Sequence, residues 1–95
     1  MLFVVHCIDH ADALPRRLEN YEKHKTYLAS GAVKTVISGP LVAQDSETMI
    51  GSMFIFEADK KDDVVSFNAN DPFRGADVWA EVRIHPFIMR VDNRD

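Results

Sequence analysis

The chain has 95 residues, a net charge of −4 and a hydrophobic share of 46%, and we expect a single domain over residues 1–95. The acidic balance without a basic block argues against nucleic acid as a partner, and no apolar run approaches the ~20 residues that span a membrane. Cys7 is the only cysteine, which excludes an internal disulfide, and a cytoplasmic location is expected.

The N-terminal third predicts a strand followed by a helix. Leu2–Ile8 is a short apolar run rich in β-branched residues, which is typical of a buried strand. Asp12 is the expected N-cap of the helix, Pro15 suits its first turn, and Gly31 is placed to end it in a left-handed conformation. The helical spacing is set by Leu14, Leu18, Tyr21 and Leu28.

The rest of the chain predicts strand, polar loop, strand, helix and strand in that order. These segments are Val33–Ile37, Leu41–Thr48, Met49–Glu57, Ala58–Asn70 and Val78–Met89. Ser38-Gly39-Pro40 is expected to end the second strand. Period-two alternation in the last strand places Val78 and Trp79 on opposite faces. A charged tail follows from about residue 91 to residue 95, and it is expected to fray.

The order strand, helix, strand, strand, helix, strand predicts an α+β fold of the ferredoxin-like βαββαβ type. With right-handed crossovers, it forms a four-stranded antiparallel sheet with two helices on one face. Strands one and three nevertheless carry apolar side chains on both faces, for example Val5 against Val4 and Phe54 against Ile55. Because a bare apolar sheet face is not tolerated in a soluble monomer, we expect a homodimer, or a higher oligomer, packed sheet against sheet.

Two residues are the leading candidates for chemistry. His24 lies in a helical row with Arg17 and Tyr21, at the edge of the apolar stripe, where a histidine is suited to general acid–base work. A structural role at the core boundary is the alternative. Asp71 precedes Pro72, which holds it outside helical geometry, so its carboxylate is placed to orient an imidazole. An ordinary turn that ends a helix is the alternative there.

Further residues are candidates for binding a substrate. Gly39, after Ser38, allows close approach of a ligand, and Ser52 stands in the third strand where space opens beside a pocket. Arg17 and Arg74 are able to hold a carboxylate through paired hydrogen bonds. Each of these residues also has an ordinary structural interpretation as a strand exit, a bulge or a surface arginine. Tyr21 is a further candidate for binding the oxygens of a substrate.

The sequence predicts no metal and no cofactor. A site built from His6, His24 and a carboxylate is conceivable, but no local spacing of ligands supports it. Cys7 is flanked by apolar strand residues, so a buried and inert thiol is expected. The chain also lacks phosphate-binding glycine loops, dinucleotide fingerprints and nucleophile elbows.

Taken together, the motifs resemble the YciI-like (YCII-related) family, whose members resemble the dimeric α+β barrel proteins. The resemblance runs from Leu2 to about Phe87, so the expected domain is a single YCII-related one. It is carried by Arg17, His24, Ser38-Gly39-Pro40, Gly51-Ser52, Asp71-Pro72-Phe73, Ala76, Val78 and Pro86-Phe87.

The resemblance implies a ferredoxin-like fold that dimerises through its sheets, with a His/Asp pair in a cleft. By position this pair is His24 and Asp71, and Phe73 joins the substrate-binding candidates. A related protein acts as a dehydrochlorinase on chlorinated hydroxyquinones. Family members often have arginine where this chain has Tyr21, and glycine where it has Asp77.

Two function classes follow. The first is a small cofactor-free enzyme that transfers protons on a small cyclic or aromatic metabolite, in an isomerisation or in a loss of water or halide. The second is a non-catalytic module that binds a small ligand or serves as an interaction domain. A heme- or metal-binding member of the barrel superfamily is a third option.

Overall fold

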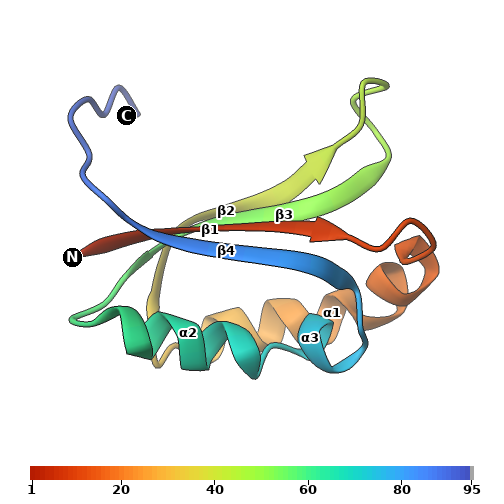
Figure 1. The fold of residues 1–95 in the computed structure, drawn as a ribbon, viewed down its shortest axis with the longest axis horizontal. Coiled ribbons are helices and arrows are strands. Elements are labelled where there is room, and N and C mark those ends of the chain that lie inside the picture. The colour runs from red at the N-terminus through yellow and green to blue at the C-terminus, as the bar shows by residue number, and fades with distance from the viewer. Residues whose placement is uncertain (95) are drawn as a thin grey trace.

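The computed structural model describes residues 1–94 and contains one antiparallel sheet with every helix on the same face (Figure 1). The sheet order is β2-β3-β1-β4. The elements are β1 (Leu2–Asp9), α1 (Leu14–Ser30), β2 (Lys34–Val42), β3 (Met49–Glu57), α2 (Lys61–Ala69), α3 (Pro72–Gly75) and β4 (Trp79–Phe87). This is the predicted ferredoxin-like α+β arrangement.

The core lies between the sheet and the helices because side chains alternate along each strand. Val5 at the centre of β1 is fully buried, and its neighbours in the register are Phe54 on β3 and Ile84 on β4. Val64 and Phe67 of α2 close this layer from the helix side. The expected alternation of β1 and β3 is therefore confirmed.

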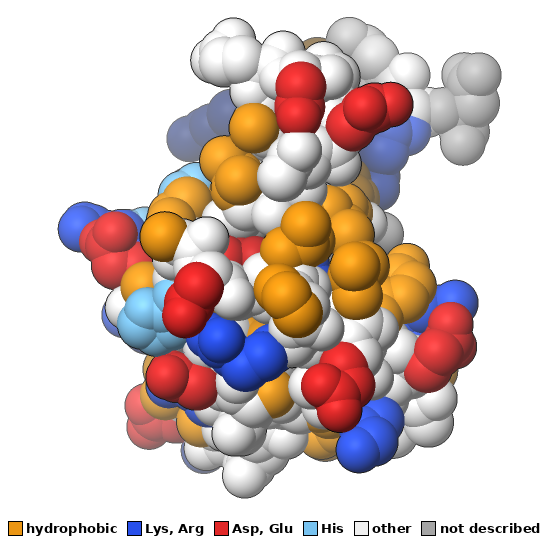
Figure 2. Space-filling view, turned by 90° about the vertical axis from the view of Figure 1, so that its right-hand side faces the viewer, with side chains coloured by type: hydrophobic (Ala, Val, Ile, Leu, Met, Phe, Trp, Pro, Cys, Tyr) orange, Lys and Arg blue, Asp and Glu red, His pale blue; other side chains and the backbone are white. Residues whose placement is uncertain are grey.

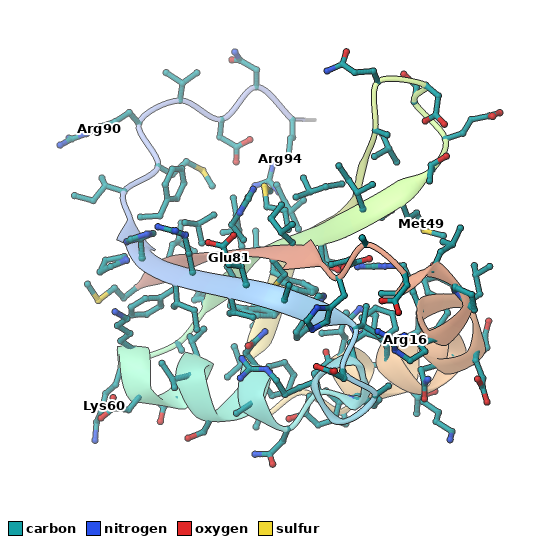
Figure 3. All side chains as sticks on the ribbon, turned by 45° about the vertical axis from the view of Figure 1, so that its right-hand side comes forward. Arg16, Met49, Lys60, Glu81, Arg90 and Arg94 are labelled. Carbon is teal, nitrogen blue, oxygen red and sulfur yellow. The ribbon has the colours of Figure 1, made fainter. Side chains whose placement is uncertain are left out.

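The opposite face of the sheet, which we term the outer face, has no helix on it (Figure 1). Val4 and Met53 on this face are only half-buried, although both are apolar. Glu81 of β4 projects from the same side of the sheet, away from the helices (Figure 3). Residues 88–94 form no helix or strand, and Asp95, the end of the expected charged tail, lies outside the described residues. No helix within residues 1–94 combines the length and apolarity needed to cross a membrane.

The second strand is longer than predicted, because Ser38, Gly39 and Pro40 belong to β2 rather than ending it. Ser38 pairs with Phe54 and Pro40 with Ser52, and the connection to β3 is shorter than expected. A proline is tolerated here because β2 is an edge strand, where one backbone N–H row has no partner strand.

Helix α1 begins one residue later than predicted and buries a different face. Its N-cap is Ala13 rather than Asp12, and no side chain caps it, whereas Gly31 ends it with a φ of 59° as expected. The side chain of Leu18 is 57% exposed, and the buried residues of the helix are Arg17 and His24. Figure 2 views the end of the molecule where α1 begins and shows hydrophobic side chains at this surface. Apolar periodicity therefore predicted the helix but not the face that it buries.

The segment predicted as one helix to Asn70 is followed by a second, four-residue helix, α3. Asp71 separates the two with extended geometry, φ −64° and ψ 138°. The proline after it disfavours helical geometry, as the sequence predicted. The turn from α3 to β4 is held to α1 by Arg16, whose Nε and Nη2 donate to backbone oxygens of the turn at 3.1 and 2.9 Å (Figure 3).

Trp79 was predicted to face away from Val78, and this is wrong. The register between β1 and β4 shifts at Ile8 and Asp9, so that Asp9 pairs with Trp79 while Ile8 pairs with Glu81. Such a bulge leaves an extra residue on β4 and breaks the alternation locally. Trp79 is consequently buried on the helix side, and Val78, which lies just before β4, is buried in the core as well.

Candidate functional site

The centre of the site is a buried contact between Asp71 and His24. Nδ1 of His24 lies 2.9 Å from Oδ1 and 2.8 Å from Oδ2 of Asp71, and the two residues are 6% and 3% exposed. Asp71 therefore points toward α1, 47 residues back along the chain, and not toward solvent. An ionised carboxylate only accepts hydrogen bonds, so Nδ1 is the donor.

Asp71 is itself held in place by the start of α3. Its Oδ1 accepts a hydrogen bond from the backbone N–H of Phe73 at 2.8 Å, which makes Asp71 the N-cap of that helix. The cap and the extended backbone before Pro72 fix the direction of the carboxylate. Both interpretations of this motif are therefore present in one residue, because the turn that begins α3 also aims Asp71 at His24.

Aromatic side chains hold the imidazole of His24 in one orientation. The ring of Phe73 stacks on it at 4.0 Å with an interplanar angle of 11°. Trp79 meets it edge-on at 6.4 Å, and Phe54 lies at 5.8 Å. Phe73 is fully buried behind the imidazole, so it supports the ring and does not line the cavity described below.

The second nitrogen of His24 has no partner within residues 1–94, although the residue borders a cavity. Because Nδ1 carries the hydrogen toward Asp71, a neutral imidazole keeps its lone pair on Nε2. With its hydrogen on Nδ1, the neutral ring has Nε2 as its acceptor atom.

That cavity has a volume of about 150 Å³ and lies between α1 and strands β2 and β3. An apolar cavity of roughly this volume is large enough for benzene, so a single six-membered ring fits here. It is lined by Arg17, Tyr21, His24, Lys25, Leu28, Ser38, Gly39, Pro40, Ser52 and Phe54. The predicted binding residues Arg17, Tyr21, Ser38, Gly39 and Ser52 thus border one cavity.

Arg74, like Phe73, is a predicted binding residue that does not line this cavity. It is exposed, and its Nη2 donates to Oδ1 of Asn68 at 2.6 Å. Arg74 lies within the short helix α3, whose start is the part that reaches the site through Asp71. Proximity in sequence to Asp71 was therefore a poor guide to its position.

Arg17 is buried beside His24 and forms an ion pair that the sequence did not predict. Its Nε and Nη2 donate to the two carboxylate oxygens of Asp9 at 2.7 and 2.8 Å, and Nη2 also donates to Oγ of Ser52 at 2.7 Å. The guanidinium lies over the ring of Phe73 at 4.8 Å. Asp9 lies one residue beyond the predicted strand Leu2–Ile8, and its position eight residues before Arg17 carries no helical signal because it lies on β1.

Lys25 is a second residue that the prediction missed, and it stands at the rim of the cavity. Its Nζ lies 5.2 Å from the ring centre of Tyr21, the position where family members often have arginine, and 3.7 Å from Glu22. The other departure, Asp77, has a φ of 55°, a left-handed conformation in which glycine is common and aspartate is tolerated. Its side chain contacts His10 at 3.2 Å.

The remaining titratable groups near the core do not join the site. Burial raises the pKa of the Cys7 thiol to about 12, which keeps it protonated and unreactive, as expected for a buried cysteine. His6 points to the outer face while His24 lies on the helix side, so the two do not share a metal ion. Within residues 1–94 there is no group of three or more His, Cys, Asp or Glu side chains placed to hold one.

Comparison with known proteins gives one family and several similar structures. The model of the YCII-related domain family matches residues 1–88. The chain is similar to a 5-chloro-2-hydroxyhydroquinone dehydrochlorinase from Burkholderia phenoliruptrix AC1100, solved in complex with 2,5-dihydroxybenzoquinone. The sequence identity is 34%, the TM-score is 0.82, and the match covers 93% of this chain and 94% of that chain.

Two more distant structures share only the fold. An uncharacterized NIPSNAP domain protein from Burkholderia xenovorans matches at 16% identity with a TM-score of 0.55, over 100% of both chains. An Arabidopsis thaliana protein matches at 14% identity with a TM-score of 0.50, over 95% of this chain and 98% of that chain. No curated protein matches the chain.

Proposed function

Because this chain belongs to the YCII-related domain family, we propose that it is a small cofactor-free enzyme that moves protons on a cyclic or aromatic metabolite. The observation that carries the proposal is His24, which has Nδ1 on a buried carboxylate and lines a cavity the size of one ring. Similarity at 34% identity to a dehydrochlorinase supports a reaction in which a proton and a halide, or water, are lost.

In this proposal His24 and Asp71 have separate roles. Nε2 of His24 is the general base that takes a proton from the substrate, and then the general acid that returns it. Asp71 keeps the hydrogen on Nδ1 and stabilises the imidazolium that forms, as the buried carboxylate does in hydrolase triads. The stacked ring of Phe73 prevents the imidazole from turning away.

A chlorinated hydroquinone illustrates the chemistry that one acid–base residue is able to perform. His24 takes the proton of a ring hydroxyl next to the carbon that bears chlorine and delivers it to that carbon. The ring then carries one carbonyl and a tetrahedral carbon bonded to hydrogen and chlorine. Removal of a second hydroxyl proton forms the other carbonyl as chloride leaves. The net loss is a proton and a chloride ion, so the step needs no oxidant or reductant.

The test compares turnover of 5-chloro-2-hydroxyhydroquinone, the compound in the name of the similar dehydrochlorinase, by the parent protein and by His24→Ala. Chloride release and the absorbance of the quinone product report the reaction. We expect His24→Ala to retain the fold and lose at least ~10²-fold in rate, the usual contribution of a general base. His10→Ala, an exposed histidine outside the cavity, is the matched control.

Two results would contradict parts of this proposal. Equal turnover by His24→Ala and the parent protein would remove His24 from the reaction. Tight binding of 2,5-dihydroxybenzoquinone with no turnover of the chlorinated hydroquinone or of related hydroxyarenes would favour the alternative, a module that binds a small ligand without changing it.

A further inference from the structure

The hydroxyl of Ser52 lies in the cavity wall and accepts hydrogen bonds from two side chains. Nη2 of Arg17 lies 2.7 Å from Oγ, and Nε1 of Trp79 lies 3.3 Å from it. Ser52 is only 2% exposed and still borders the cavity. Its environment therefore differs from that of an ordinary strand serine.

The donors around Ser52 determine where its own hydrogen points. A guanidinium and an indole N–H have no acceptor lone pair, so in both contacts Ser52 is the acceptor. A serine hydroxyl has two acceptor lone pairs and one hydrogen, and the two contacts use the lone pairs. Within residues 1–94 no acceptor takes the hydrogen of Ser52, whereas other serines such as Ser30 donate theirs to a backbone oxygen. The hydrogen is left for a molecule in the cavity.

We propose that Ser52 is an oriented hydrogen-bond donor that binds an acceptor oxygen of the substrate beside Nε2 of His24. The proposal rests on the proposed function and specifies its substrate class. The cavity has a base on one wall and a donor on another, so its ligand carries an acidic proton and an acceptor oxygen on one small ring. Hydroxyquinones and hydroxyarenes, whose oxygen gains negative charge as a proton leaves, have this pattern.

The hydrogen bonds and the ion pair of Arg17 limit the class of substrate further. Three of its five N–H groups are engaged by Asp9 and Ser52, and within the described residues Nη1 has no partner. The ion pair with Asp9 is neutral as a whole, with both side chains no more than 4% exposed. The wall near Ser52 thus favours an oxygen with delocalised charge, such as a phenolate or enolate, over a phosphate that needs unpaired cations.

Trp79 and Asp9 act through other residues and are positioning residues. Asp9 holds the guanidinium against Ser52, and Trp79 occupies the second lone pair of the hydroxyl. Without the indole N–H, the hydroxyl is free to rotate between orientations. Trp79→Phe is therefore expected to weaken binding through Ser52, by less than the removal of Ser52 itself.

The test measures binding of two ligands by titration calorimetry. The first is 2,5-dihydroxybenzoquinone, and the second is benzene, which has the ring without the oxygens. We expect Ser52→Ala to weaken binding of the quinone by about ten- to hundredfold, as expected for a hydrogen bond to a charged oxygen. Binding of benzene should change by about twofold or less, because the alanine removes no contact that benzene uses.

Two further variants separate this role from damage to the fold. Ser52→Thr retains the hydroxyl and should restore quinone binding to within about fivefold of the parent protein. Ser66→Ala, an exposed serine on α2, should bind both ligands as the parent protein does. Circular dichroism of each variant checks that the fold is retained.

The outcomes distinguish this inference from the proposed function. Quinone binding that is unchanged in Ser52→Ala, or a loss that is equal for quinone and benzene, would overturn the role of Ser52 while leaving the turnover test of His24 intact. Normal turnover in His24→Ala together with a quinone-specific loss in Ser52→Ala would overturn the role of His24 and leave the role of Ser52 intact. Absence of quinone binding by the parent protein would overturn the assigned substrate class.

Discussion

Replacing Asp71 with asparagine separates the two tasks of this side chain. Asparagine has almost the same volume, and its amide oxygen is able to accept the N–H of Phe73 that Asp71 accepts at 2.8 Å. It is also as good an N-cap as aspartate, so α3 should still form. What it removes is the second acceptor beside Nδ1 of His24, because an amide nitrogen only donates.

We expect the imidazole of His24 to change tautomer in Asp71→Asn. Nδ1 would accept from the amide, and the hydrogen would move to Nε2, which then has no lone pair toward the cavity. Turnover should fall by ~10⁴-fold, the size of the loss when the aspartate of a serine-protease triad becomes asparagine. The hydrogen bond between a charged carboxylate and His24 is replaced by a neutral one, so the free energy of unfolding should fall by about 1 kcal/mol, the difference between the two kinds of hydrogen bond.

Three measurements check this prediction. Chloride release from the chlorinated hydroquinone reports turnover, urea denaturation reports stability, and NMR that correlates ring nitrogens with ring protons reports the tautomer of His24. Asp77→Asn is the matched control and should change none of them, because the side chain of Asp77 is 80% exposed and contacts His10 rather than His24. If Asp71→Asn keeps both the Nδ1–H tautomer and the full rate, the reasoning about the carboxylate is refuted.

The remaining predictions concern stability at alkaline pH and assembly. Burial raises the pKa of Cys7 from about 9 to about 12, so between these values only the unfolded chain loses the proton. The free energy of unfolding therefore falls as pH rises, by up to about 1.4 kcal/mol per pH unit for this group. In urea titrations from about pH 8 to pH 11, Cys7→Ala should show a shallower fall, and an identical slope would contradict the assignment. For the outer face, we expect light scattering to give a dimer at micromolar concentration and Val4→Lys to shift it toward monomer. Val65→Lys, at an exposed position on α2, should not do so, and a monomeric parent protein would refute the sheet-to-sheet dimer.

The contact between His24 and Asp71 was predictable in part because each residue carries a local signal. Pro72 disfavours helical geometry at Asp71, and helical spacing places His24 two turns after Arg17. Neither signal shows that the two side chains meet, because they are 47 residues apart. The family resemblance supplied that pairing. In the structure, the packing of α3 against α1 brings the two side chains into contact.

The wall formed by Asp9, Arg17, Ser52 and Trp79 was not predictable in the same way. It depends on a one-residue register shift between β1 and β4, which turns Trp79 inward and sets Asp9 opposite it. A shift of one residue reverses the face of every side chain beyond it, and sequence alternation does not reveal where it occurs. Hydrophobic spacing likewise placed Leu18 on the apolar stripe of the first helix, although the tertiary contacts of α1 bury Arg17 and His24 instead.

The sequence by itself determined the order of strands and helices, the end of α1 at Gly31 and the extended backbone at Asp71. These features depend on backbone preferences and side-chain period, which act over a few neighbouring residues. Only the tertiary structure decided which polar groups share the cavity and which way their hydrogens point. Those contacts join residues that are distant along the chain, and they depend on strand register and on how closely the helices pack against the sheet.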